Sequence, residues 1–256
     1  MRSYAAKWYR TLASYFPSKS LLTARRLKDS PLRCFGLPHE SDFLPLKELR
    51  GQDLLIVDVG ANRGQSIDSF TSVLGDARIT SIEPNPILAQ ALRKHYPTID
   101  IHNLALGAKP DALTLHVPRY GYTYWDTRAS LDNDFASSFL GPHNFMFFRE
   151  ERAGLESFDV PVGTLDELAL APDILKIDAE GYEYEILLGG HQTLSGAPIV
   201  IIEKPGPDII KYMEKYGFDP YSAVGSKLIQ RTGKLNTIFL HPAKHRKFIA
   251  TVLVEL

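Results

Sequence analysis

The chain has 256 residues, of which 44% are hydrophobic and 23% charged, and its formal net charge is −1. These values suit one large α/β domain with added elements, and the near-zero charge argues against nucleic-acid binding. The single cysteine, Cys34, excludes a disulfide framework or a cysteine-rich metal site within the chain. No apolar run approaches the roughly 18 residues of a membrane span, and the N-terminus lacks the pattern of a signal peptide. We therefore expect a cytoplasmic protein.

Residues 1–50 predict an N-terminal helical extension that precedes a domain spanning residues 51–256. Aromatic residues recur at helical spacing between Ala5 and Phe16, with Lys7 and Arg10 among them. This pattern favours short helices packed on the domain. Aromatic and basic residues together also suit an interfacial helix, so the alternative is that residues 1–30 contact an anionic membrane or a partner protein.

The segment 53–65 predicts a strand, a glycine turn and the start of a helix. Residues 54–57 are apolar, and the turn that follows contains Gly60, Asn62 and Gly64. Glycines let the backbone approach a ligand closely, and a helix N-terminus presents unpaired N–H groups. The segment therefore predicts a nucleotide-type site, with an ordinary strand-to-helix connection as the alternative.

Strands and helices then alternate along the chain. We expect strands at 78–83 and 99–104, a helix at 86–95 between them, and an additional strand at 112–117. Such alternation predicts a doubly wound, mostly parallel α/β sheet. Residues 118–157 interrupt it with an aromatic-rich insertion, which is typical of a lid or substrate-binding element. A structural excursion with its own aromatic core is the alternative.

The alternation resumes after the insertion. Thr164 and Glu167 form a capping-box pattern at a helix start. The remaining predicted elements are strands at 159–165, 173–178 and 197–203, helices near 183–188 and 208–216, and a C-terminal antiparallel hairpin of 227–231 with 235–240.

Two carboxylates help to identify the ligand of the glycine turn. Glu83 follows the turn by roughly the 20 residues that a dinucleotide site requires, but the single spacing Gly60-x-x-x-Gly64 departs from its glycine pattern. Asp58 would repel a pyrophosphate and suits a cationic ligand such as S-adenosylmethionine. Glu83 would then accept hydrogen bonds from the ribose hydroxyls, and residues from Asn103 to Ala105 would line the adenine. An NAD-type oxidoreductase is the less favoured alternative.

An ordered set of motifs lies between about residues 54 and 204. The motifs are Asp58-Val-Gly-Ala-Asn-Arg-Gly64, Ile82-Glu-Pro-Asn-Pro86, Ala105-Leu-Gly107, Val162-Gly-Thr-Leu-Asp166, Leu175-Lys-Ile-Asp-Ala-Glu-Gly-Tyr-Glu183, Leu188-Gly-Gly190 and Ile201-Ile-Glu203. Together they resemble the FkbM family of S-adenosylmethionine-dependent methyltransferases. The resemblance implies a class I methyltransferase (Rossmann-like) fold and O-methylation of hydroxyls on sugars, glycans or natural products. After Glu203 the family pattern leads us to expect a short polar residue or a histidine, whereas this chain has Lys204 and Pro205.

Methyl transfer to a hydroxyl requires alignment of the acceptor and removal of its proton. Asp178, Glu180 and Glu203 stand near the ends of two successive predicted strands, so we expect them to be the catalytic carboxylates. Alternatively, Asp178 and Glu203 hold a divalent cation that acidifies the hydroxyl. We expect Lys176 to pair with one of these acids and Glu183 to lie on a helix surface.

We therefore predict a methyltransferase that acts on a small-molecule or glycan acceptor. A non-catalytic binding subunit with the same fold is the alternative. The complete set of acids at the predicted strand ends argues against it.

Overall fold

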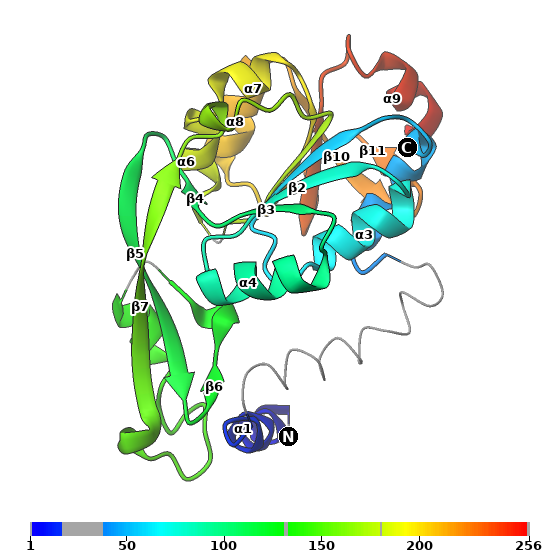
Figure 1. The fold of residues 1–256 in the computed structure, drawn as a ribbon. Coiled ribbons are helices and arrows are strands. Elements are labelled where there is room, and N and C mark those ends of the chain that lie inside the picture. Colours follow the sequence, from blue (N-terminus) through cyan, green and yellow to red (C-terminus); the bar gives the residue numbers. More distant parts are fainter. Residues whose placement is uncertain (1, 17–37, 131–132, 180, 255–256) are drawn as a thin grey trace.

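The computed structural model describes residues 2–16, 38–130, 133–179 and 181–254. Within them, the main sheet has eight strands in the order β11-β10-β12-β9-β8-β1-β2-β3 (Figure 1). The strands from β9 to β3 run parallel to one another. β12 is antiparallel to β9, β10 to β12, and β11 to β10. The predicted mostly parallel α/β sheet is therefore confirmed. The bounds are β1 Leu55–Val59, β2 Arg78–Ile82, β3 Asp100–His102, β8 Ile174–Ile177, β9 Ile199–Glu203, β10 Asp219–Val224, β11 Lys227–Ile229 and β12 Asn236–Leu240.

Helices cover both faces of this sheet, because its central strands are apolar at successive positions and so bury side chains on both sides. In β1, Ile56 joins the core under one helical layer and Val57 joins the core under the other. The first layer contains η1 (Ser41–Leu49), α3 (Gln65–Leu74), α4 (Pro86–His95) and α9 (Arg246–Val252). The second contains α6 (Glu183–Leu188), α7 (His191–Ser195) and α8 (Pro207–Lys215).

The predicted pairing of 227–231 with 235–240 is wrong, although the antiparallel C-terminal part exists. β11 pairs with β10, and β12 lies between β10 and β9. All five residues of β12 are buried, which is typical of an interior strand of a sheet covered on both faces. The hairpin is instead β10–β11, turning at Gly225, whose φ is +60°.

A second sheet of the described chain has four strands in the order β4-β7-β5-β6. Its main part is the long antiparallel ribbon of β5 (Asp111–Tyr120) and β7 (Ala153–Gly163), so the predicted strands at 112–117 and 159–165 are parts of one ribbon. The insertion has its own core of Tyr120, Trp125, Phe139 and Phe145. The shorter elements here are β4 (Ala105–Leu106), β6 (Thr123–Tyr124), η2 (Asp126–Arg128), α5 (Asn133–Ser138), η3 (Glu150–Arg152) and η4 (Asp166–Leu168).

The N-terminal extension contributes two described helices. α1 (Arg2–Ala13) lies beside β6, at the end of the second sheet far from α6 (Figure 1). η1 packs on α3, where the rings of Phe43 and Phe70 stack with centroids 4.5 Å apart. Residues 17–37, between the two helices, lie outside the described residues. Along the described chain, every helix is too short or too polar to cross a membrane.

Candidate active site

A cavity of about 590 Å³ lies where the carboxyl ends of β1, β2 and β8 meet the second sheet. This edge of a parallel sheet is the usual place for a ligand in open α/β folds. Of the predicted site residues, Gly60, Asn62, Glu83, Ala105 and Asp178 line the cavity. The lining does not include Asp58, Gly64, Asn103 or Glu203, and Glu180 lies outside the described residues. The second sheet contributes Leu113, Leu115 and Val160, and η2 contributes Asp126 and Arg128.

Glu83 is held rigidly at the end of β2. Its Oε2 accepts a hydrogen bond from the Asn62 N–H at 2.7 Å, and its Oε1 accepts one from the Asn85 N–H at 2.9 Å. Burial raises the pKa of Glu83 to about 8, although the two N–H donors oppose the rise. The carboxyl group thus joins the first turn to the second strand and borders the cavity.

The two glycines of the first turn are required by the packing of the protein itself. Gly60 has a φ of +81°, and a Cβ there would lie 1.8 Å from the carbonyl oxygen of Asp178. Gly64 has a φ of +86°, and a Cβ there would lie 2.5 Å from the ring of Tyr96. Gly60 also borders the cavity, as expected for a glycine that lets a ligand approach, and both glycines permit close contact with the residues that follow β8 and α4.

Asn62 lies between the two glycines and faces the cavity. Its φ of +48° is in the left-handed region, which asparagine tolerates better than most residues. Its Oδ1 is buried and accepts no hydrogen bond from the described residues. An unsatisfied buried acceptor costs roughly 1–3 kcal/mol, so a donor from a bound ligand would stabilise this side chain.

Asp58 is completely buried and does not face the cavity. It accepts a 2.6 Å hydrogen bond from Ser66 Oγ, and its Oδ1 lies 3.8 Å from Lys176 Nζ. Burial raises the pKa of Asp58, and the positive charge of Lys176 opposes the rise. The expectation that Asp58 faces a cationic ligand is therefore corrected, because the cation beside it is an internal lysine.

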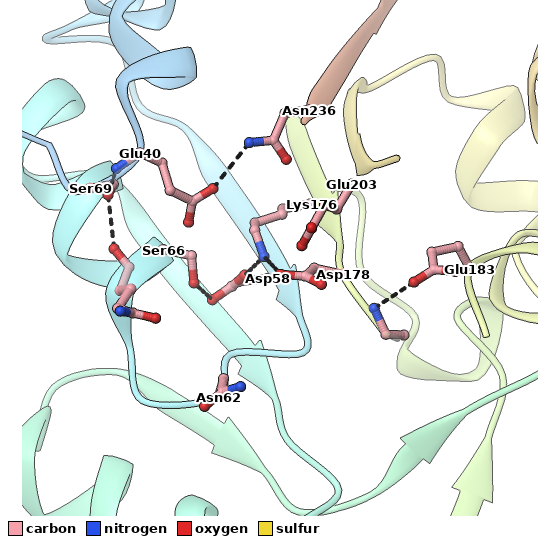
Figure 2. Close-up of polar contacts among 12 residues, drawn as sticks. Glu40, Asp58, Asn62, Ser66, Ser69, Lys176, Asp178, Glu183, Glu203 and Asn236 are labelled. Carbon is pink, nitrogen blue, oxygen red and sulfur yellow. Dashed lines mark hydrogen bonds and ion pairs between the residues drawn. The ribbon is translucent and has the colours of Figure 1, made fainter. Parts of the chain in front are cut away.

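Lys176 is the centre of a buried charge cluster (Figure 2). Its Nζ lies 3.2 Å from Asp178 Oδ2, and only 3% of its side chain is exposed. Burial alone would lower the pKa of Lys176, but the charges of Asp58, Asp178 and Glu40 raise it. The expected pairing of this lysine with a site carboxylate is confirmed.

Glu40 is a member of this cluster that the sequence did not reveal. Its Oε2 accepts a hydrogen bond from Asn236 Nδ2 at 3.4 Å. Burial raises the pKa of Glu40 to about 7, whereas the charge of Lys176 opposes the rise. The residue comes from the N-terminal extension, and no local pattern in the sequence marks it.

Asp178 is the member of the cluster that reaches the cavity, with 30% of its side chain exposed. Glu203, at the end of β9, points toward it (Figure 2). Burial raises the pKa of Glu203, and Asp178 adds to the rise. Lys204, at the position where a short polar residue or histidine was expected, forms an ion pair with Glu203.

Glu183 and Asn103 do not line the cavity, and each holds a backbone segment beside it in place. Glu183 is 9% exposed, so the expectation of a surface carboxylate is wrong. Its Oε1 accepts hydrogen bonds from the N–H groups of Ala179 and Gly181, at 2.9 and 3.1 Å, and thereby shapes the loop after Asp178. Asn103 Nδ2 donates to the carbonyl oxygens of Glu83 and Pro84, both at 2.9 Å, and fixes the turn after β2.

An ion pair joins the first turn to the opposite wall of the cavity. Arg63 Nε donates to Asp126 Oδ2 at 3.1 Å, and a second guanidinium nitrogen contacts Oδ1 of the same carboxylate. Asp126 comes from the aromatic-rich insertion. The insertion is therefore attached to the turn and lines the same cavity.

The candidate metal ligands do not form a metal site with other described residues. In those parts of the chain, no group of three or more His, Cys, Asp or Glu side chains has a suitable arrangement. The ammonium group of Lys176 already supplies a positive charge between Asp58 and Asp178.

Residues 58–220 match the family model described as the methyltransferase FkbM domain. No curated protein matches the chain.

Three solved structures are similar to this chain. A TehB-like SAM-dependent methyltransferase from Corynebacterium glutamicum is 12% identical, with 87% of this chain and 99% of that chain covered and a TM-score of 0.41. A precorrin-6y C5,15-methyltransferase from Geobacter metallireducens is 13% identical, with coverages of 78% and 84% and a TM-score of 0.38. A SAM-dependent O-methyltransferase from Thermotoga maritima is 11% identical, with coverages of 79% and 64% and a TM-score of 0.38.

Proposed function

Because the chain belongs to the family of FkbM methyltransferase domains, we propose that it is an S-adenosylmethionine-dependent O-methyltransferase. Its acceptor is a hydroxyl of a sugar, a glycan or another natural product. The observation that carries the proposal is that Glu83, Asn62 and the ion-paired carboxylate of Asp178 border one cavity. Glu83 and Asn62 suit cofactor binding, and Asp178 suits proton removal.

The residues of the cavity fit the cofactor. Glu83 presents a carboxyl group that can accept hydrogen bonds from ribose hydroxyls, and the unsatisfied Oδ1 of Asn62 requires a donor. Ala105 and the leucines of the second sheet provide an apolar wall for the adenine. The volume of about 590 Å³ is within the usual range of roughly 300–1,000 Å³ for ligand pockets.

When bound, S-adenosylmethionine supplies the methyl group. Asp178 accepts the proton of the acceptor hydroxyl, a step that typically contributes about 10²–10⁴-fold to the rate. Lys176 orients Asp178 through the 3.2 Å contact between its Nζ and the carboxylate. Glu203 lies beside this pair and is a second candidate for the proton.

A divalent cation bound to Asp178 and Glu203 is the other route to an activated hydroxyl. Turnover in the presence of EDTA distinguishes the two routes. We expect turnover to continue, because the ammonium group of Lys176 already supplies a positive charge beside Asp178. Loss of turnover with EDTA, restored by Mg²⁺, would establish the metal route.

Cofactor binding is tested by calorimetry with S-adenosylhomocysteine. The wild type should bind, and Asn62→Gly should bind about tenfold more weakly, as expected for one lost hydrogen bond. Glycine is a suitable replacement because it keeps the left-handed backbone at this position. An unchanged melting temperature of the variant shows that the turn remains folded. Absence of binding by the wild type refutes the proposal.

The role of Asp178 is tested by Asp178→Asn. The variant should bind S-adenosylhomocysteine as the wild type does and should lose about 100-fold or more in turnover. Turnover is followed with an isotopically labelled methyl donor and a glycan and metabolite extract, by mass spectrometry of the methylated products. Full turnover by the variant would assign Asp178 a purely structural role.

A further inference from the structure

Helix α1 is amphipathic in the opposite sense to an ordinary surface helix. Its polar side chains face the protein: Lys7 Nζ donates to the carbonyl oxygen of Pro142 at 3.1 Å, and an Arg10 guanidinium nitrogen donates to Asn144 Oδ1 at 3.0 Å. Thr11 Oγ1 accepts a 2.8 Å hydrogen bond from the Met146 N–H. The polar side of the helix therefore serves to attach it to the insertion.

The outward side of the helix and the turn that follows is aromatic and aliphatic. We call this surface the α1 patch. Phe147, which is 77% exposed, extends it, with its ring edge-to-face against Trp8 at a centroid distance of 6.1 Å. Soluble proteins rarely expose a contiguous apolar surface without a binding partner. The patch consists of Tyr4, Trp8, Tyr9, Leu12, Tyr15, Phe16 and Phe147, all of them exposed.

The α1 patch is fixed to the folded domain. Thr123 Oγ1 contacts the carbonyl oxygens of Ala13 and Phe16, both at 2.7 Å. The guanidinium of Arg152 lies 4.0 Å from the centroid of the Tyr15 ring. The exposure of the patch is therefore a property of a docked helix and not of a fraying end.

Charge identifies the surface that the α1 patch fits. Residues 1–37 contain eight Lys and Arg residues against the single acid Asp29, whereas the remaining chain contains 21 basic and 29 acidic residues. Lys7 and Arg10 are bonded to the insertion. The other six basic residues adjoin the exposed row of Trp, Tyr, Phe and Leu in the sequence, and this combination matches the interface of an anionic bilayer. There, aromatic rings lie at the level of the headgroups and basic residues are attracted to the lipid charge.

We propose that the α1 patch docks the protein on the surface of an anionic phospholipid bilayer, with α1 lying in the plane of the interface. The proposal depends on the orientation of α1 and on charge, and it holds whatever the acceptor of the methyl group is.

Tryptophan fluorescence of the full chain provides a direct test. The chain has two tryptophans, of which Trp8 is 45% exposed and Trp125 is 5% exposed in the insertion core. Vesicles of phosphatidylglycerol and phosphatidylcholine should shift the emission to shorter wavelength and protect it from iodide, whereas phosphatidylcholine alone should not. Trp8→Phe should abolish the spectral change and still co-sediment with the anionic vesicles. High salt should weaken co-sedimentation.

A matched pair of variants isolates the patch. Trp8→Ser with Leu12→Ser should weaken partition into anionic vesicles by about tenfold or more, from the apolar area that is no longer buried. Val224→Ser with Leu235→Ser removes exposed apolar groups at the antiparallel part of the main sheet and should bind as the wild type does. Both variants should keep the melting temperature and the affinity for S-adenosylhomocysteine.

Three results would overturn the proposal. The first is a wild type that does not sediment with anionic vesicles. The second is equal partition of the Trp8→Ser, Leu12→Ser variant, which would place the contact elsewhere. The third is a wild type that forms a dimer and does not bind vesicles, while the Trp8→Ser, Leu12→Ser variant is a monomer. The patch would then be covered by a second copy of the chain.

Discussion

Replacement of Lys176 by methionine should destabilise the protein through charge, because methionine has nearly the same shape as the lysine stem. In the wild type, Nζ lies 3.8 Å from Asp58 Oδ1, whose side chain is 0% exposed, and 3.2 Å from Asp178. Removing one partner of a buried pair typically costs about 3–5 kcal/mol, because the other charge stays buried without compensation. We therefore expect a loss of this size in the free energy of unfolding near neutral pH. That loss is a large part of a typical domain's stability of about 5–15 kcal/mol.

The pH dependence separates a charge effect from a packing effect. Burial already raises the pKa of Asp58, and loss of the lysine raises it further. A carboxyl group with a raised pKa stabilises the fold at low pH, and this contribution is lost as the pH rises. Urea unfolding of Lys176→Met should thus show a smaller loss near pH 5 than near pH 8. Adding Asp58→Asn should recover most of the stability near pH 8. An equal loss at both pH values, without recovery in the double variant, would refute the reasoning.

Three further predictions concern the first turn and the walls of the cavity. Gly60→Ala places a Cβ against the carbonyl oxygen of Asp178, so it should lower both the free energy of unfolding and the affinity for S-adenosylhomocysteine. Gly51→Ala is the control, because Gly51 has a similar φ of +84° but open space around it. It should cost only about 1 kcal/mol in an unfolding titration. Burial raises the pKa of Glu83 from 4.5 to about 8, so its stabilising contribution is complete below about pH 4.5 and lost as the pH rises through 8. Glu83→Gln should remove this part of the stability profile, and a profile parallel to the wild type would contradict the pKa shift. Asp126→Asn should lower the free energy of unfolding in urea by about 1–3 kcal/mol, because it breaks the ion pair with Arg63. In a double-mutant cycle with Arg63→Met, the two losses should not add, and additive losses would show that the pair contributes nothing.

The central strands could be predicted because their apolar, β-branched runs are continuous and end at glycine, proline or acidic residues. β10 was missed because Asp219, Pro220 and Ser222 dilute its apolar pattern. Its pairing with β12 also depends on which edge of the sheet is free, and local sequence does not carry that information. The same reason explains the wrong hairpin.

The site shows a similar division. Acids at neighbouring strand ends were predictable, because parallel strands bring their carboxyl ends to one edge. Which of these acids face the cavity and which face Lys176 depends on the direction of each side chain. Asp58 pairs in register with Lys176, and Lys176 shares a strand face with Asp178, two residues further on. Glu40 and Asp126 could not be predicted, because each reaches the site from an element distant in sequence.

These contacts make the first turn and the proposed base a single unit. The Asp58–Lys176–Asp178 chain connects β1 to β8 by charge, and the close approach of Gly60 to the Asp178 carbonyl connects them by backbone packing. A shift of the turn would therefore move the proposed base, so the proposed mechanism couples cofactor binding to the position of that base. In the same mechanism, Asp58 holds the lysine that orients the base, and it would affect turnover without touching either substrate.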